Sequence, residues 1–195
     1  MIREKEFRSL GTYIAEMVNA YKSVDDKKVE ELVSLLRSCQ LENRTVFLCG
    51  NGGSASTSNH AAVDLGIGSH IRGVRINTVA LTCNSSILTA IANDLEFREI
   101  FSRQIHLHGS EGDVLIVISA SGNSENLVCA IEAAKQLKMS TVALLGFDGG
   151  KIKQMANLVL HANTKIGEYG LVEDIHLSLI HYITERIRKE FIVVE

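Results

Sequence analysis

The chain has 195 residues, 46% hydrophobic and 22% charged, which is the balance of a globular protein long enough for one domain with a sizeable core. Its net charge of −3 gives no general attraction to nucleic acid or to an acidic membrane surface. Aromatic residues make up 5% and tryptophan is absent, so few side chains could stack on nucleic-acid bases, and we expect no direct nucleic-acid partner.

The N-terminal residues 5–38 have apolar residues at helical spacing and predict two amphipathic helices. The break falls near 24–26, where Asp25 or Asp26 can cap the second helix. Two long helices before the first strand indicate an N-terminal arm, residues 1–40, that acts as a lid or packs against another subunit.

From residue 41 onward the pattern changes to short apolar runs that are separated by helical patterns. The runs barely alternate between apolar and polar residues, as expected for strands buried on both faces; they are 45–49, 78–81, 114–119, 141–145 and 158–161. The helical patterns are 54–66, 86–92, 98–108, 124–138 and 171–190.

This alternation predicts an α/β fold, a three-layer α-β-α sandwich with a five-stranded parallel sheet of flavodoxin or Rossmann type. Residues 41–195 would form the α/β core of a single domain that spans 1–195. The carboxyl ends of the strands, and with them the functional site, would share one edge of the sheet.

The cysteines and the first residues indicate the compartment. Cys39, Cys49, Cys83 and Cys129 are too far apart for a zinc knuckle or a CxxC redox pair, and free thiols fit a reducing compartment. Residues 1–10 lack the apolar core of a signal peptide, and no apolar run reaches membrane-spanning length. We expect a cytoplasmic protein that does not contact a membrane.

The strongest functional pattern is the serine-rich segment 119–124, which follows the third predicted strand. A phosphate dianion needs many donors, and free N–H groups at a helix start supply them together with the helix dipole. The hydroxyls of Ser119, Ser121 and Ser124 can add donors, and Gly122 lets the backbone come close. The segment therefore predicts a phosphate site, with an ordinary polar turn capped by Ser124 as the simpler alternative.

An earlier turn, 50–55, has the form G-x-G-x-x-A, which alone would fit a dinucleotide site. Such sites have an acidic residue near the end of the next strand, whereas here that strand ends in Leu81-Thr82-Cys83. A turn that closes over sugar hydroxyls fits better, because Asn51 and Ser54 offer hydrogen bonds.

Ionisable residues on two predicted helices offer metal or acid–base chemistry. His60 and Asp64 are four residues apart and share a helix face, an arrangement equally typical of an exposed pair. Glu173 and His181 are eight residues apart, about 12 Å on a straight helix, so one ion could not easily bind both. Either Glu173 lies in the entry turn, or the two serve different copies of a site at a subunit interface, or Glu173 only favours the helix N-terminus.

A set of segments follows in order along nearly the whole chain: Cys49–Ser54, His60, Ala92-Asn93-Asp94, Phe101-Ser102-Arg103, Glu111–Leu115, Ser119–Asn126, Asp148–Lys151, Ile175-His176 and His181. Together these segments resemble the phosphoheptose isomerase branch of the sugar-isomerase (SIS) domain family. The resemblance implies a homotetramer with active sites between subunits. It also implies conversion of sedoheptulose 7-phosphate to D-glycero-D-manno-heptose 7-phosphate for surface polysaccharides.

The resemblance further implies a role for each matching residue. The substrate and its phosphate would be bound by Asn51, Gly52, Gly53, Ser54, Asn93, Asp94, Ser119, Ala120, Ser121, Ser124 and Glu173. A divalent metal, expected to be zinc, would be held by His60, Asp64, Glu173 and His181. Asp64 and His181 would also be the catalytic acid–base pair.

The chain departs from the family pattern around this site. Asp64 stands where the family has Glu, and Glu173 where it has Gln. Gly68 stands for Arg, Gly170 for Asp and Ala120 for Thr. These changes keep two alternatives open: a non-catalytic SIS protein that binds sugar phosphates or associates with a replication initiator, and an isomerase of another sugar phosphate.

Overall fold

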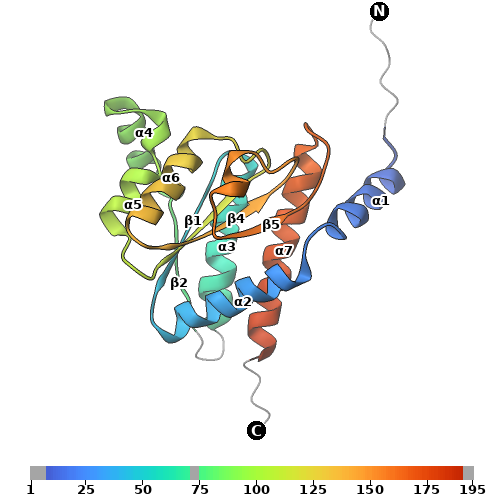
Figure 1. Ribbon diagram of the computed structural model, residues 1–195, viewed down its shortest axis with the longest axis horizontal. Helices are drawn as coiled ribbons and strands as arrows, with labels where there is room; N and C mark the ends of the chain where they lie inside the picture. Colours follow the sequence, from blue (N-terminus) through green and yellow to red (C-terminus); the bar gives the residue numbers. More distant parts are fainter. Residues whose placement is uncertain (1–7, 71–74, 191–195) are drawn as a thin grey trace, which may run out of the picture.

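The computed structural model describes residues 8–70 and 75–190 and contains one parallel sheet (Figure 1). Its five strands are β1 (Thr45–Gly50), β2 (Asn77–Ala80), β3 (Val114–Ser119), β4 (Ser140–Leu145) and β5 (Leu158–His161). They are ordered β2-β1-β3-β4-β5, and every neighbouring pair is parallel. The five-stranded parallel sheet predicted from the apolar runs is confirmed.

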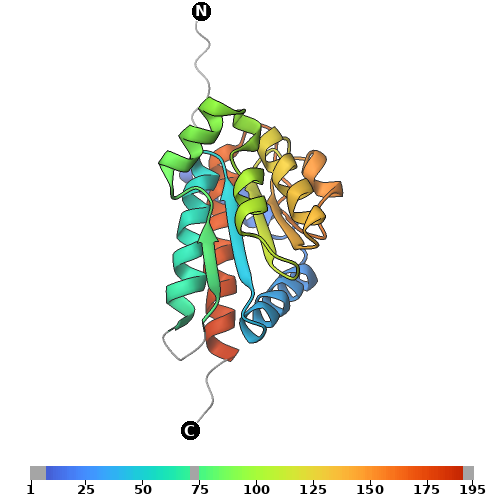
Figure 2. The same cartoon turned by 90° about the vertical axis from the view of Figure 1, so that its left-hand side faces the viewer.

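Helices connect the strands and cover both faces of the sheet. They are α1 (Leu10–Tyr21), α2 (Asp26–Leu41), α3 (Gly53–His70), α4 (Ser85–Asp94), α5 (Ser102–His108), α6 (Glu125–Gln136) and α7 (Tyr169–Glu190), with 3₁₀-helices η1 (Phe97–Glu99) and η2 (Lys151–Gln154). Figure 2 shows α3 and α7 side by side in one layer and α5 and α6 across the sheet from them. The predicted three-layer sandwich is therefore confirmed.

Alternate residues of the central strands feed two separate hydrophobic cores. Leu48 and Ile116 point to the core shared with α2, α3 and α7, whereas Phe47 and Leu115 point to the core shared with α5 and α6. Since successive side chains of a strand point to opposite faces, a sheet buried on both sides must be apolar at every position. This is the physical reason that the strand segments lack alternation.

The N-terminal arm consists of two helices that pack differently. Asp25 caps α2 by accepting a hydrogen bond from the Lys27 N–H, and α2 buries Leu32 and Leu36 in the core of the domain. By contrast, α1 projects from the body in Figure 1, and Ala20 is the buried residue it contributes. The predicted start of this first helix at residues 5–7 lies outside the described residues.

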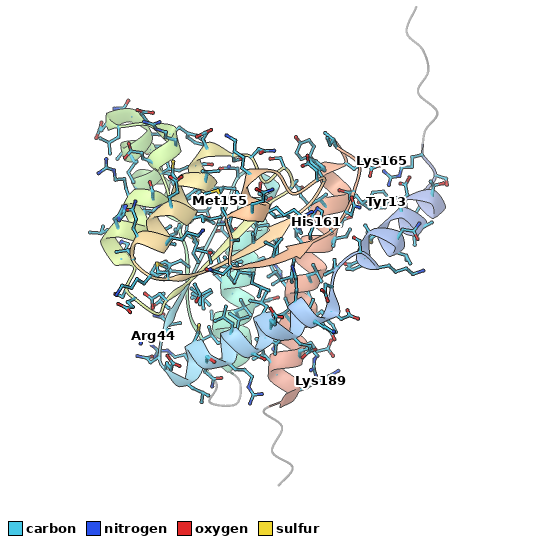
Figure 3. The ribbon with its side chains drawn as sticks, viewed as in Figure 1. Tyr13, Arg44, Met155, His161, Lys165 and Lys189 are labelled. Carbon is cyan, nitrogen blue, oxygen red and sulfur yellow. The ribbon has the colours of Figure 1, made fainter. Side chains whose placement is uncertain are left out.

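One contact fastens α1 to the last helix. The hydroxyl of Tyr13, labelled in Figure 3, donates a hydrogen bond of 2.5 Å to Asp174 Oδ2 in the N-terminal part of α7. Burial and this carboxylate raise the pKa of Tyr13 to about 12, so the phenol keeps its proton. The arm is thereby tied to the same end of α7 that carries Glu173.

Two further observations concern the cysteines and the polarity of the helices. The four cysteines are free thiols, with Cys39 and Cys49 buried and Cys83 exposed. Within the described residues, the helices are all too short or too polar to span a bilayer.

Candidate active site

The two glycine- and serine-rich turns meet at the carboxyl edge of the sheet. β1 and β3 are direct neighbours, so the turn into α3 and the loop into α6 leave the sheet side by side. Asn51 and Asn126 join the two turns through a reciprocal amide pair, with N···O distances of 2.9 and 2.8 Å. Ligands of open α/β sheets bind at such a point, where the connections diverge to opposite faces.

A pocket of about 100 Å³ lies between these turns. Its lining contains Asn51, Ser54, Ser119, Ala120, Ser121, Ser124, Tyr169 and Glu173. The structure thus brings together, from three separate segments, the residues expected to hold a phosphate. Oxygen-rich walls next to two helix starts provide the donors and the dipoles that an anion requires.

The serine hydroxyls of the segment 119–124 differ in the hydrogen bonds that they make. Ser119 Oγ accepts a hydrogen bond of 3.0 Å from Gly122 N, and Ser121 Oγ accepts one of 3.3 Å from Asn123 N. Ser124 occupies the N-cap position of α6, but its side chain makes no capping hydrogen bond. The Ser124 hydroxyl therefore does not cap α6, as it would in the simpler alternative of an ordinary polar turn.

Glu173, a residue of α7, lies against the start of α3. Its carboxylate rests against Gly53, the first residue of α3, so closely that a Cβ at position 53 would overlap it. A negative charge is stabilised at a helix N-terminus. The pocket consequently has one acidic wall.

His60, Asp64 and His181 converge between α3 and α7. The Nε2 atoms of the two histidines are 2.9 Å apart, and Asp64 Oδ2 lies 3.3 Å from His60 Nε2 and 3.7 Å from His181 Nε2. Two ligands about 2.0 Å from a tetrahedral zinc ion would be about 3.3 Å apart, which matches this spacing. Two imidazoles and one carboxylate are the donor set of a catalytic zinc site.

Glu173 does not join this group. α7 is one unbroken helix, so Glu173 and His181, eight positions apart, have well-separated side chains. The ligand atoms within 4.8 Å of one another belong to His60, Asp64 and His181. Within one described chain, Glu173 belongs to the serine pocket.

Other predicted site residues lie elsewhere. Asn93 and Asp94 end α4, are exposed, and hydrogen-bond to each other at 2.9 Å, away from the lining of the serine pocket. Gly52 is exposed with φ +55°, as the turn into α3 requires. Both amide atoms of Asn51 are used in its pair with Asn126.

Two residues of the site were not among the candidates selected from the sequence. Asn126 is 2% exposed and orients Asn51; its place in the first turn of α6, directly after the serine-rich segment, was the available signal. Tyr169 lines the pocket and packs edge-on against Phe147 at 5.0 Å. Nothing in its sequence context marks it.

Comparison with known proteins agrees with this geometry. The SIS domain family model matches residues 12–146. A phosphoheptose isomerase from Helicobacter pylori is 36% identical over 179 residues, covering 88% of this chain and 92% of that protein. The solved phosphoheptose isomerase of Neisseria gonorrhoeae is 34% identical with a TM-score of 0.82, covering 92% of this chain and 94% of that one.

A second solved phosphoheptose isomerase, from Francisella tularensis, is 26% identical with a TM-score of 0.84 and the same coverage of both chains. These likenesses extend over almost the full length of both partners. This chain therefore belongs to the SIS domain family, in its phosphoheptose isomerase branch.

Proposed function

We propose that the chain is a phosphoheptose isomerase that interconverts sedoheptulose 7-phosphate and D-glycero-D-manno-heptose 7-phosphate, a step toward lipopolysaccharide or capsule heptose. The observation that carries this proposal is the presence of two sites along α3: an anion pocket at its start and the His60–Asp64–His181 group further along. Ser54 and His60 are about 9 Å apart along the helix axis. An open-chain heptose 7-phosphate has its phosphate and its carbonyl near opposite ends, so two separated sites support this substrate.

The phosphate would be bound in the serine pocket. The hydroxyls of Ser54, Ser121 and Ser124 and the N–H groups at the starts of α3 and α6 act as donors there. The N–H donors are fixed by the backbone, so little order has to be created among them on binding. The acidic wall formed by Glu173 would weaken binding of the dianion unless the side chain moves aside.

The isomerisation would use Asp64 and His181. Asp64, as base, takes a proton from C1 of the ketose, and O2 takes up a proton from water as the C1–H electron pair forms the enediol. His181 then gives a proton to C2, the O1 proton passes to water and the C1 aldehyde forms. Asp64 releases its proton to water and His181 regains one from water, so protons and charge balance over the cycle. The close approach of the two side chains supports this assignment, because both can reach adjacent carbons of one substrate.

His60, Asp64 and His181 would hold a divalent cation, which we propose to be zinc. When bound, the ion supplies Lewis-acid stabilisation of the negative charge that develops on the substrate oxygens. The Nε2 atoms of His60 and His181 face each other at 2.9 Å. A shared ion would accept a lone pair from each nitrogen, so the two rings would not need a proton between them. Glu173 would contribute as a ligand only after a large change of its side-chain position.

We also propose a cytoplasmic homotetramer whose active sites lie between subunits. Apolar side chains on the outer faces of α1 and α3 support an assembly, since Leu10, Ile14, Val63 and Ile67 are each more than half exposed in the single chain. Burying such patches is a common driving force for oligomerisation.

The test is turnover of sedoheptulose 7-phosphate by the purified zinc-loaded protein. Asp64→Asn and His181→Ala should each lower kcat by about 100-fold or more, as expected for loss of a general acid or base. Unchanged rates in both variants would refute the assigned roles.

The same assay separates the alternatives. Thermal stabilisation by the sugar phosphate without turnover would indicate a non-catalytic binding protein. Turnover of a pentose or hexose phosphate, with sedoheptulose 7-phosphate inert, would indicate an isomerase of another sugar.

A further inference from the structure

We propose that the turn formed by residues 148–152 is a structural part of the phosphate site, and that Asn123 is the positioning residue that couples it to the serine loop. This inference rests on the proposed function, because it takes the serine pocket to be the phosphate site. It assigns a role in binding to a turn whose own residues do not line the pocket.

The side-chain amide of Asn123 makes two hydrogen bonds that join the serine loop to the turn 148–152, and we call this pair of bonds the clamp. Its Oδ1 accepts a hydrogen bond of 3.0 Å from the main-chain N–H of Lys151, and its Nδ2 donates one of 3.0 Å to the carbonyl of Ser121. A side-chain amide is the group that can accept and donate in this way. The clamp therefore fixes the main chain at Ser121 relative to the start of η2.

The two loops are also in direct backbone contact. Ile152 N donates to the Gly122 carbonyl at 3.0 Å. A Cβ on Gly122 would overlap the Gly149 carbonyl, and a Cβ on Gly150 would overlap the Ser121 carbonyl. All three glycines have positive φ, at +62°, +88° and +53°, so both the conformation and the close approach require glycine.

The contact between the serine loop and the turn 148–152 fixes the orientation of the groups that would donate hydrogen bonds to phosphate. The hydroxyls of Ser121 and Ser124 and the N–H groups at the start of α6 belong to the segment that the clamp holds. Preorganised donors bind an anion more tightly than donors that must first be ordered. Asn123 is exposed and hydrogen bonds of this kind contribute little to folding, so we expect the clamp to matter mainly for binding.

The test uses variants that remove the clamp from either side. Asn123→Ala removes both amide bonds, and Asn123→Asp keeps the acceptor for Lys151 N but loses the donor to Ser121. Lys151→Pro deletes the N–H from the other loop at the first residue of η2, a position that tolerates proline in helices. Lys151→Ala is the matched control, because it keeps the N–H and loses only the surface pair with Glu125.

We expect the zinc-loaded Asn123→Ala and Lys151→Pro variants to bind inorganic phosphate about tenfold more weakly by calorimetry. The KM for sedoheptulose 7-phosphate should rise to a similar extent, with kcat within about twofold of wild type. Asn123→Asp should also bind phosphate more weakly than wild type, because it loses the donor to Ser121 and adds a negative charge beside the pocket. Lys151→Ala should match wild type. The double variant Asn123→Ala/Lys151→Pro should bind no more weakly than Asn123→Ala alone, because the bond that Lys151→Pro removes is already lost in Asn123→Ala.

The outcomes are distinguishable. Variants that lose thermal stability but keep phosphate affinity and KM would show a purely structural role and overturn the inference, while the proposed function would stand. A wild-type protein that neither binds inorganic phosphate nor turns over the sugar phosphate would overturn both.

Discussion

The carboxylate of Glu173 rests on Gly53, although the two residues lie 120 positions apart and belong to different helices. It places a fixed negative charge at the N-terminus of α3, the position where an incoming phosphate would gain from the helix dipole. The acidic side chain and a phosphate therefore compete for the same electrostatic environment.

Replacing this carboxylate should strengthen phosphate binding. Glu173→Gln keeps the size of the side chain and removes the charge, and we expect inorganic phosphate to bind about fivefold or more tightly by calorimetry. Asp174→Asn is the control, since Asp174 is directed at Tyr13 and does not line the pocket. Unchanged phosphate affinity combined with weakened zinc binding would instead identify Glu173 as a metal ligand.

The zinc site can be tested without any assay of activity. Adding zinc to metal-free protein should raise its melting temperature, because an ion that binds only the folded state stabilises it. His60→Ala and His181→Ala should each weaken zinc binding by at least about tenfold and largely abolish this rise. His106→Ala, on the exposed side of α5, is the control. An equal rise in all four proteins would place the ion elsewhere.

The amide pair between Asn51 and Asn126 should contribute more to the free energy of unfolding than an ordinary surface contact does. Asn126→Ala removes both bonds and leaves the Asn51 amide unpaired in a part-buried site, at a cost of about 1–3 kcal/mol in the free energy of unfolding. Urea unfolding measures the loss, and phosphate affinity should fall with it. A loss below about 0.5 kcal/mol would mean that water satisfies Asn51 instead. Asn157, whose bonds to Thr141 are remote from the pocket, offers a control as Asn157→Ala that should leave phosphate affinity unchanged.

His176 should make folding sensitive to acid. The imidazole is 1% exposed, and burial lowers its pKa to about 4, partly opposed by the main chain of Leu145. The folded state therefore favours the neutral ring, and the unfolded state takes up a proton first as the pH falls. Stability should be fully present above about pH 6.5 and should decline between 6.5 and 4, by at most about 3 kcal/mol.

Unfolding free energies measured from pH 7.5 to 4.5 check this dependence. His176→Leu should flatten the decline, whatever its effect on stability at pH 7.5. The same slope in the variant would show that carboxylates rather than His176 cause the acid sensitivity. His161→Leu is a useful comparison, because burial lowers the pKa of His161 too, although that ring is only partly buried.

The sequence by itself determined the elements of the fold and singled out the serine-rich segment 119–124. Apolar runs located all five strands, and an aspartate at the break marked the start of α2, because these signals depend on neighbours within a few residues. Boundaries were less exact: the predicted helix 98–108 is divided into η1 and α5. The unusual density of serines at 119–124 indicated an anion site in this segment without any knowledge of the fold.

Only the tertiary structure decided which of these segments face one another. The Asn51–Asn126 pair, the approach of His181 to His60 and the position of Glu173 on Gly53 join segments 75 to 121 residues apart. Such contacts follow from the order of the strands and from the packing of α3 against α7, which no local pattern encodes. The separation of Glu173 from His181 was foreseeable from the helical rise, but its place at the start of α3 was not, because that depends on which helix lies alongside.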